Sequence, residues 1–439
     1  MRRYIGVFLV VALLIGLLSV SAAAEPVNIV FWHSMQNPLD NKFMEEIVVQ
    51  FNETYPGINV EGVLVPGTET EITKLMTAVA AGTGPDVYYL DRFTVAQRAH
   101  YGVLEPLEGY LIQAGVNIEA LKSKFFDFAV KEATYNGELY ALPWDTDARV
   151  LYYNKKLFEE AGLDPNKPPR TISELDEYAD KLTIMKGNQI QQAGFVPWSG
   201  QGWHYTWSWA FGGKFYDPES KKLIFADDPK IVKALEWEKT YATKYGMKNI
   251  DAFRAAYGVG GGAGGVAIGG VEPINMFLVG KEAMLIQGNW FLSQIIQFAP
   301  EGFEYGIAPI PSPPDGEKNS TWCGGWSLVI PKGSKHPKEA AEFLAYMTTV
   351  GEIKYALDTT HFAASKESVQ KLVEANPEQK MFADLLPIAH CRPVIPAGAL
   401  LWDKLSEAWN YALYGEKSVG QALKDAQNEV QAELDKTFK

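Results

Sequence analysis

The sequence predicts an α/β protein that is built from two lobes. Strand-like apolar runs alternate with helix-patterned runs between residues 27 and 90, which favours a largely parallel sheet with helices on its faces. The chain has 439 residues, which is more than one ordinary hydrophobic core accommodates. Its content of 47% apolar and 21% charged residues is typical of a folded globular protein and not of a disordered one.

Residues 1–24 have the pattern of a secretory signal peptide. Two arginines at positions 2 and 3 precede the apolar run Ile5–Leu18, and Ala22–Ala24 supplies an A-x-A cleavage site. A membrane anchor is the alternative, but the apolar run is shorter than the roughly 20 residues that a spanning helix needs. We therefore expect cleavage before Glu25. No cysteine lies near this site, so we expect an exported protein without a lipid anchor.

Polar side chains follow the first and third expected strands. The strand Val27–Trp32 ends just before His33 and Ser34, and the strand at 86–90 ends just before Asp91 and Arg92. Ligands of open α/β sheets bind beyond the carboxyl ends of the strands, so these residues are candidates for a binding site. Further strands are expected at 58–65, 139–143, 150–153, 283–286 and 323–331, and helices at 43–51, 71–81, 171–182, 231–245, 337–348, 351–357, 401–413 and 419–437.

A polar cluster interrupts two apolar strands near the middle of the chain. Trp144, Asp145, Asp147 and Arg149 stand between the expected strands at 139–143 and 150–153. Charged side chains between apolar strands are costly to bury without partners. The pattern therefore favours a cleft edge at this point, where the chain passes from one lobe to the other.

Three motifs together resemble the family 1 extracellular solute-binding proteins of ABC importers, and in particular their maltose- and sugar-binding members. The motifs are GTGPDVYYLDRF (82–93), LPWDTDARVLYYNKKLFEEAGLDP (142–165) and QALKDAQNEV (421–430). Motifs recur in the family's order from residue 27 to 434, so the resemblance covers nearly the whole mature chain. It is specific for the family and poorly specific for the ligand.

The resemblance implies a two-lobed periplasmic-binding-protein fold of type II with three hinge crossings, near residues 144–146, 326–329 and 362–365. The N-terminal lobe would comprise residues 25–144 and 328–363, and the C-terminal lobe residues 145–327 and 364–439, so each lobe is discontinuous. The implied function is a periplasmic, monomeric receptor that closes on a mono- or oligosaccharide and delivers it to the membrane permease subunits of an ABC importer. A receptor for glycerol phosphate or a sugar phosphate is the alternative within the family.

A heavy aromatic content agrees with sugar binding. The chain has 12 tryptophans, 21 tyrosines and 22 phenylalanines. The flat face of an indole suits the C–H face of a pyranose ring. The resemblance matches Trp290 and Trp402 to ligand-stacking tryptophans, while Trp203 and Tyr205 lie in the most aromatic stretch of the sequence. Core packing is the alternative for each of these side chains.

The polar candidates are suited to the hydroxyl rim of a sugar. By the resemblance, Asp91 and Arg92 match a sugar-binding Asp-Arg pair, and Asp147 matches a ligand-binding carboxylate. A carboxylate accepts from two hydroxyls and an arginine donates in a planar fork. A surface salt bridge is the alternative for Asp91 and Arg92. The segment WHSM at 32–35 resembles other members, including glycerol-phosphate binders, and leaves His33 as either a contact or a supporting residue.

Two more features point to the ligand. Gly324 and Gly325 would let backbone amides approach a ligand closely, or would simply form a tight hinge turn. Arg392 matches a ligand contact of relatives, and its charge suits either an anionic ligand or neutral hydroxyls. The predicted ligand-binding residues are therefore His33, Ser34, Gln36, Asp91, Arg92, Trp144, Asp147, Trp203, Tyr205, Trp290, Gly324, Gly325, Arg392 and Trp402.

Two cysteines, Cys323 and Cys391, leave two possibilities open. They are either two buried thiols or one disulfide, which an oxidising compartment permits.

Other functions find little support in the sequence. The net charge of -13 disfavours a nucleic-acid partner. The glycines at 260–265 satisfy G-x-G-x-x-G formally, but no helix-patterned run follows to receive a phosphate. The six histidines show no ligand spacing, so we expect no metal and no cofactor. A secreted carbohydrate-active enzyme using Asp145 and Asp147 remains as an alternative, although no known catalytic signature is present and we expect no enzyme activity.

Overall fold

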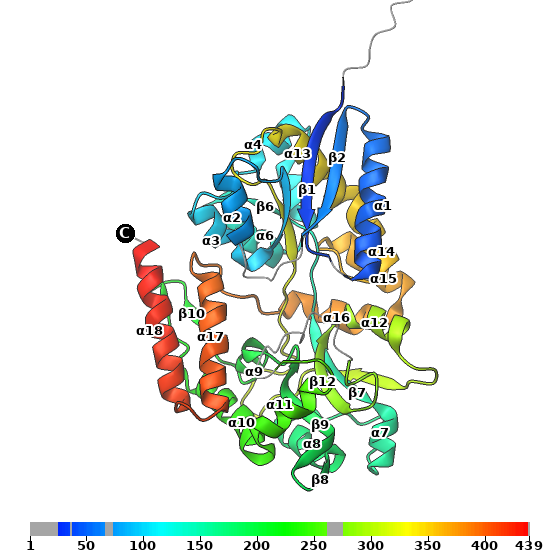
Figure 1. Cartoon of the computed structure of the whole chain (residues 1–439), viewed down its shortest axis with the longest axis vertical. Coiled ribbons are helices and arrows are strands. Elements are labelled where there is room, and N and C mark those ends of the chain that lie inside the picture. Colours follow the sequence, from blue (N-terminus) through cyan, green and yellow to red (C-terminus); the bar gives the residue numbers. More distant parts are fainter. Residues whose placement is uncertain (1–24, 36, 66–72, 261–274, 438–439) are drawn as a thin grey trace, which may run out of the picture.

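The computed structural model describes residues 25–35, 37–65, 73–260 and 275–437. The predicted signal peptide, Gln36 and most of the glycine-rich loop at 260–265 lie outside the described residues. Two five-stranded sheets form two lobes, one above the other in Figure 1. The strand order of the first sheet is β2 (Ile58–Leu64), β1 (Val27–His33), β3 (Val87–Asp91), β14 (Trp326–Val329) and β6 (Ala141–Pro143). The strand order of the second sheet is β13 (Tyr305–Ala308), β7 (Arg149–Asn154), β12 (Glu282–Gly288), β9 (Gln189–Gly200) and β8 (Ile184–Lys186).

The first sheet brings two predicted site segments to one edge. Strands β2, β1 and β3 are parallel, so the chain leaves β1 and β3 at the same end of the sheet. Strand β14 joins them antiparallel, with Trp326 opposite Asp91. Ser34, Asp91 and Trp326 therefore lie at the edge that faces the second lobe.

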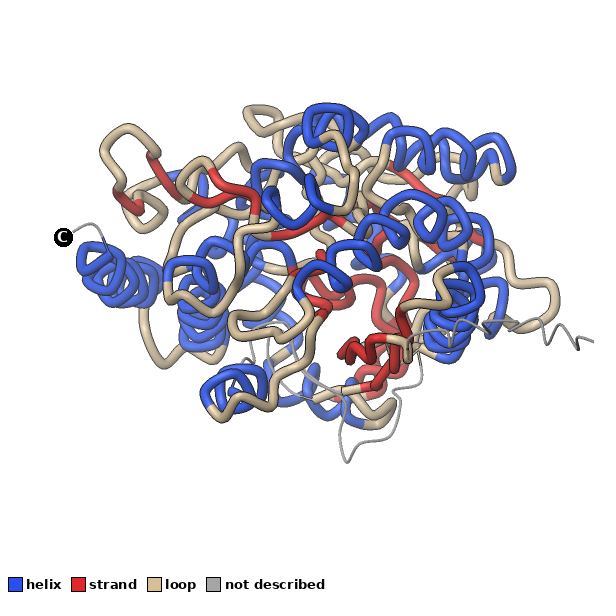
Figure 2. The backbone as a smooth tube through the Cα atoms, turned by 90° about the horizontal axis from the view of Figure 1, so that it is seen from above, coloured by secondary structure: helices blue, strands red, loops and turns tan. Residues whose placement is uncertain are grey.

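Helices cover both sheets (Figures 1 and 2), as the alternation of apolar runs predicts. Around the first sheet lie α1 (Pro38–Thr54), α2 (Thr73–Ala80), α3 (Val95–His100), α4 (Glu108–Gln113), α5 (Ile118–Lys124), α6 (Asp127–Glu132), α13 (Pro337–Tyr346) and α14 (Glu352–Thr359). Around or below the second lie α7 (Lys155–Glu160), α8 (Ile172–Leu182), α9 (His204–Ala210), α10 (Pro229–Tyr245), α11 (Met247–Ala255), α12 (Phe291–Phe298), α16 (Lys380–Leu385), α17 (Gly398–Leu413) and α18 (Val419–Thr437). Helix α15 (Lys366–Ala375) packs against α14 in the first lobe.

Several helix boundaries follow from local chemistry. Helix α8 begins with a capping box, in which the Thr171 side chain accepts from the Glu174 N–H and Glu174 accepts from the Thr171 N–H. Helix α1 starts with Pro38 and an Asn37 side chain that accepts from a backbone N–H in its first turn. Across the described residues, no helix combines the length and the apolar character that crossing a bilayer requires.

Three chain crossings join the lobes and run side by side. The Trp144 N–H donates to the Trp326 carbonyl (2.9 Å), and the Ala364 N–H donates to the Trp144 carbonyl (2.9 Å). Asp145 also pairs with Ala363 in an isolated β-bridge. These bonds bind the three crossings into one narrow connection, which confirms the predicted two-lobed fold with three crossings. The exact residues at which each lobe begins and ends stay a prediction.

A buried arginine fixes this connection. Arg92 follows β3 and donates through Nη1 to the carbonyl of Asp145 (2.6 Å), through Nη2 to the carbonyl of Gly324, and through Nε to Glu132 Oε2 (2.8 Å). It thereby ties the first crossing to the second. Gly325 permits this arrangement, because its φ of 125° is in the region that favours glycine and an added Cβ would lie 2.3 Å from the Asp145 carbonyl oxygen.

Candidate functional site

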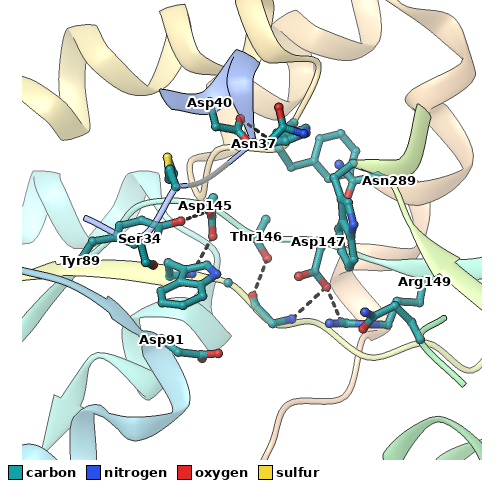
Figure 3. A pocket seen from close by; sticks show the side chains of 18 of the residues that line it. Ser34, Asn37, Asp40, Tyr89, Asp91, Asp145, Thr146, Asp147, Arg149 and Asn289 are labelled. Atoms are coloured by element: carbon teal, nitrogen blue, oxygen red, sulfur yellow. Dashed lines mark hydrogen bonds and ion pairs between the residues drawn. The ribbon is translucent and has the colours of Figure 1, made fainter. Parts of the chain in front are cut away.

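A cavity of about 390 Å³ lies between the lobes beside the crossings, and Figure 3 shows side chains of both lobes converging on it. Its residues form three groups. The second lobe supplies an aromatic wall of Arg149, Gln201, Trp203, Asn289, Trp290, Trp322, Arg392 and Trp402. The first lobe supplies an acidic wall of Ser34, Met35, Asn37, Asp40, Tyr89, Asp91, Trp326 and Tyr355. Between the walls lie the crossing residues Asp145, Thr146, Asp147, Gly324, Gly325, His361 and Phe362.

The aromatic wall is a stack of rings and guanidinium groups. The rings of Trp203 and Trp402 have centroids 4.5 Å apart. The Arg149 guanidinium lies 3.3 Å from the Trp322 ring centroid and 5.4 Å from that of Trp290. These contacts hold the indoles in place before any ligand arrives, so little conformational freedom is lost when one binds.

Trp290 is placed by the glycine two residues before it. A Cβ added to Gly288 would lie 1.9 Å from the Trp290 ring, so only glycine at the end of β12 leaves room for this indole. Trp290 then serves as the N-cap of α12, and its side chain is half-buried on the cavity. The glycine of the sequence segment QGNW therefore leaves the space in which this indole lies at the cavity.

Hydrogen-bond donors of the acidic wall hold the Asp145 side chain in place. Asp145 Oδ2 accepts from the Tyr89 hydroxyl (2.8 Å), and Oδ1 accepts from the Trp326 backbone N–H (2.6 Å). Burial raises the pKa of Asp145 to about 7, although these two hydrogen bonds lower it. The Tyr89 ring stacks on Trp326 with centroids 4.6 Å apart. Trp326 thus presents an indole from the wall opposite the other tryptophans.

Both guanidinium groups of the cavity are paired with carboxylates. Arg149 Nη1 donates to Asp147 Oδ1, which also accepts from the Gly324 N–H (3.0 Å). Arg392 Nη2 donates to Asp91 Oδ1 (3.0 Å), and the Arg392 guanidinium lies 3.8 Å from the Phe93 ring centroid. The second pair spans the cavity from the aromatic wall to the acidic wall. It is buried, so breaking it would cost far more than breaking a surface ion pair.

One end of the cavity holds a polar network around His361. Its Nδ1 lies 2.8 Å from the Tyr355 hydroxyl and 3.3 Å from Asp40 Oδ1, and its Nε2 lies 3.2 Å from Ser293 Oγ. Burial lowers the pKa of His361 to about 4 and raises the pKa of Asp40 to about 7. His361 is therefore neutral near neutral pH, whereas Asp40 is about half protonated there.

Nine of the predicted ligand-binding residues lie on this cavity. They are Ser34, Asp91, Asp147, Trp203, Trp290, Gly324, Gly325, Arg392 and Trp402. They come from both lobes and from the crossings, and they are up to several hundred residues apart in the sequence. The structure thus brings together most of the residues that the sequence analysis selected, while their contact with a ligand stays a prediction.

Four other predicted residues are described but do not line the cavity. Arg92 is fully buried behind the crossings, as described above. Trp144 is buried beneath α1 and α14, where its ring contacts Phe43 and Tyr355. Tyr205 is buried behind Trp402, and His33 packs on Phe31, where burial lowers its pKa to about 4.

The physical reason for this placement is that adjacent side chains point in different directions. Asp91 and Arg92 are neighbours at the end of β3, yet Asp91 lines the cavity and Arg92 turns into the protein. The same contrast separates the buried Trp144 from Asp145 on the cavity. A linear motif marks such a segment without stating which of its residues faces the ligand.

Several cavity residues were not among the predicted ligand-binding residues, although the sequence had placed Asp145 and Arg149 in a polar cluster at a cleft edge. They are Met35, Asn37, Asp40, Tyr89, Asp145, Thr146, Arg149, Gln201, Asn289, Trp322, Trp326, Tyr355, His361 and Phe362. Asn289 and Trp326 directly neighbour selected residues and Trp322 lies two positions before Gly324, so proximity in the sequence was an available signal. Tyr355 and His361 carried no local signal, because they reach the cavity only through the packing of α14 and the third crossing.

Metal binding and acid–base catalysis find no built site here. Within the part of the chain that the structure describes, no three His, Cys, Asp or Glu side chains converge as metal ligands would. The two carboxylates proposed for the enzyme alternative, Asp145 and Asp147, are both engaged by donors of the protein.

The family model of the bacterial extracellular solute-binding proteins matches residues 36–353 of this chain. The chain belongs to this family. Its relatives are binding proteins and not enzymes, so the comparison confirms the resemblance seen in the motifs and the expectation that this family member is not an enzyme.

Solved structures share the fold over the whole length. The structure of CpMnBP1 with mannotriose bound is 31% identical, has a TM-score of 0.80, and is matched over 92% of this chain and 100% of that chain. The structure of maltose-bound MalE3 of T. maritima is 26% identical with a TM-score of 0.71, over 93% of this chain and 100% of that chain.

Curated relatives include receptors for two ligand classes. The maltotriose-binding protein of Pyrococcus abyssi is 24% identical over 92% of this chain and 82% of its own length. The sn-glycerol-3-phosphate-binding periplasmic protein of Salmonella typhimurium is 27% identical over 70% of this chain and 66% of its own length. The sugar receptors therefore match more of the chain than the glycerol-phosphate receptor does.

Proposed function

We propose that this protein is a periplasmic receptor that captures a neutral mono- or oligosaccharide and delivers it to an ABC importer. The observation that carries the proposal is the composition of the cavity. Five tryptophans, Trp203, Trp290, Trp322, Trp326 and Trp402, line it together with carboxylate, amide and hydroxyl groups. Indoles suit the faces of sugar rings, and the polar groups suit the hydroxyls at their edges.

The charge of the cavity supports a neutral ligand over a phosphorylated one. Among its described residues are the four carboxylates of Asp40, Asp91, Asp145 and Asp147, and two guanidinium groups, both of which already hold carboxylate partners. A phosphate group would have to displace these partners and approach the remaining carboxylates. Neutral hydroxyls can instead accept from the arginines and donate to the acids at the same time.

The position of the walls supports capture by closure. The aromatic wall belongs to the second lobe and the acidic wall to the first, while the narrow triple crossing connects the lobes and the Asp91–Arg392 pair joins the two walls. A sugar that contacts both walls binds the closed arrangement more tightly than the open one, which shifts the population toward closure. The closed form is then the one that docks on the permease, while a separate subunit hydrolyses ATP.

The remaining parts of the proposal are supported by the pattern of the first 24 residues and by the family resemblance. Residues 1–24 direct export and are removed before Glu25, without a lipid anchor. The mature chain acts as a monomer, with an N-terminal lobe of residues 25–144 and 328–363 and a C-terminal lobe of residues 145–327 and 364–439. Its protein partners are the permease subunits of the importer.

A thermal-shift panel with recovery of the sugar tests the proposal. Purified mature protein is mixed with mono-, di- and oligosaccharides and with sn-glycerol 3-phosphate. A binding sugar at 100 times its Kd should stabilise the fold by about 2.7 kcal/mol and raise Tm, and chromatography should recover it unchanged. Turnover of a sugar would indicate the enzyme alternative, and a shift with glycerol phosphate alone would indicate the other receptor class.

A further inference from the structure

A buried amide on the cavity has no partner within the protein. Asn289 is only 1% exposed, and both its Oδ1 and its Nδ2 lack a hydrogen-bond partner among the described residues. An unpaired buried amide destabilises a folded protein. Asn289 is one of the residues that line the cavity (Figure 3), so the unused donor and acceptor belong to the cavity wall.

The backbone holds Asn289 in this position. Its N–H donates to the carbonyl of Ala148 at the first crossing (3.2 Å), and its carbonyl accepts from the Leu292 N–H in the first turn of α12 (3.2 Å). The next residue is Trp290, whose ring is fixed over Gly288. The amide is therefore a rigid group between the crossing and an indole of the aromatic wall.

Asn289 lies at the end of the cavity where the acidic wall contributes Asp40. Ser293, one turn further along α12, contacts His361, which in turn contacts Asp40 (3.3 Å). The opposite end of the cavity holds the Asp91–Arg392 pair. The polar groups at the two ends differ. One end has the Asp40 side chain and the unpaired Asn289 amide, and the other end has the Asp91–Arg392 ion pair.

We infer that Asn289 is a specificity-determining residue, which together with Asp40 binds two adjacent hydroxyls of one sugar ring. An amide donates and accepts at once, as does a hydroxyl, so Asn289 can pair with two neighbouring hydroxyls, and Asp40 can accept from one of them. This inference rests on the proposed function. It adds which end of the cavity distinguishes sugars by the positions of their hydroxyls.

The test compares wild type, Asn289→Leu and Asn289→Ala by calorimetry against the best-binding sugar of the panel and its single-position deoxy analogues. Loss of the amide should weaken binding about 10- to 100-fold. The wild type should reject the deoxy analogue that lacks the recognised hydroxyl, whereas Asn289→Leu should bind the parent sugar and that analogue equally well. A merely structural role would leave the order of preference unchanged.

Stability supplies the second readout. Because Asn289→Leu removes an unpaired buried amide, the Tm of the ligand-free variant should equal or exceed that of the wild type. Equal affinity and equal selectivity in wild type and Asn289→Leu would overturn the inference. If the wild type binds no sugar at all, the proposed function fails instead, so the two failures are distinguishable.

A second, independent observation concerns the cysteines. The Sγ atoms of Cys323 and Cys391 lie 2.6 Å apart, and the chain segments that carry them are paired. The Cys323 N–H donates to the His390 carbonyl (2.8 Å), and the His390 N–H donates to the Thr321 carbonyl (2.9 Å). These hydrogen bonds hold the two segments, and with them the two sulfurs, side by side.

The geometry points to a disulfide between Cys323 and Cys391 in the exported protein. Each thiol gives up a hydrogen, the sulfur–sulfur bond forms, and the two electrons and two protons reduce a disulfide of the compartment's thiol–disulfide exchange system to two thiols. Gly324 and Arg392 directly follow these cysteines and line the cavity. The bond would therefore brace two segments of the cavity wall against each other.

Thiol titration of the denatured protein tests this inference. Protein incubated with oxidised glutathione should show no titratable thiol, and two should appear after dithiothreitol. The oxidised form should have a Tm about 5 °C or more above the reduced form, while the Tm of Cys391→Ser should not respond to dithiothreitol. Two titratable thiols after incubation with oxidised glutathione would overturn the inference.

Discussion

The two walls of the cavity differ in composition and in their expected contribution to binding. Apart from Asn289, the aromatic wall is built mainly from rings that pack on one another and on two arginines, so it is a preformed surface whose arginines already hold carboxylate partners. The acidic wall places carboxylates and hydroxyls at the ends of parallel strands and at a helix start. The comparison indicates that affinity comes chiefly from the aromatic wall, and that the acidic wall, with Asn289, sets which hydroxyls are accepted.

The Asp91–Arg392 pair joins the two walls, so Asp91→Ala should have the largest effect. The variant leaves the buried Arg392 guanidinium without the Asp91 carboxylate, which should lower the free energy of unfolding by about 3–5 kcal/mol. Denaturant unfolding measures this loss. In the double variant with Arg392→Met the loss should be smaller than in Asp91→Ala alone; equal losses would show that the pair does not couple the walls.

The relative position of the walls depends on the second crossing, which Gly325→Ala should disturb. The added Cβ would lie 2.3 Å from the Asp145 carbonyl oxygen and 2.8 Å from Arg92 Nη1, at a φ of 125°. We expect a loss of about 3 kcal/mol in unfolding free energy. Gly333→Ala is the matched control, because Gly333 has a φ of 87° but open space around its Cβ, and it should cost about 1 kcal/mol. Similar losses in both variants would contradict the proposed constraint.

Trp290→Ala tests the aromatic wall itself. Removing this indole should weaken sugar binding by about 2 kcal/mol, roughly 30-fold, without changing the order of preference among deoxy analogues. Trp290→Phe keeps a flat ring and should retain much of the affinity. Calorimetry on both variants measures the effect. A changed order of preference among hydroxyl positions in Trp290→Ala would contradict the claim that the aromatic wall supplies affinity and the acidic wall, with Asn289, supplies selectivity.

The acidic wall should make stability depend on pH through Asp40. Burial raises the pKa of Asp40 from 3.8 to about 7, so the native state keeps a proton that the unfolded state releases as pH rises from 4 to 7. This contribution is fully present below pH 4 and is lost as pH rises toward 7. His361, with its pKa lowered to about 4, acts in the opposite direction, whereas the neighbouring Tyr355 hydroxyl stays protonated throughout.

Comparing wild type with Asp40→Asn isolates the Asp40 contribution, because His361 is common to both proteins. Between about pH 5 and pH 7, the unfolding free energy of the wild type should fall relative to that of the variant by at most about 1.4 kcal/mol per pH unit. Denaturant unfolding at several pH values measures this difference. A difference that stays constant with pH would show that Asp40 is ionised in the folded protein.

Much of the fold was predictable because its signals are local. The alternation of strands and helices depends on a few neighbouring residues at a time, and the structure confirms it. The family motifs likewise marked the segments that reach the cavity. What the sequence could not provide is the direction of each side chain, which separates Asp91 on the cavity from the buried Arg92.

Other site features depend on contacts between distant segments. Asn289 becomes a candidate only when both its amide atoms prove to be buried without partners, and no sequence pattern reports that. His361 reaches the cavity through packing against Asp40, Tyr355 and Ser293, which come from three separate helices. Such residues are found from the assembled structure and not from motifs.

One calorimetric comparison tests the central claim most directly. The wild-type mature protein is titrated with mannotriose, with maltotriose and with sn-glycerol 3-phosphate under identical conditions. We predict saturable binding of at least one of the neutral sugars and no measurable binding of the glycerol phosphate. Binding of the glycerol phosphate with neither sugar bound would contradict the claim that indoles and paired charges form a site for a neutral carbohydrate.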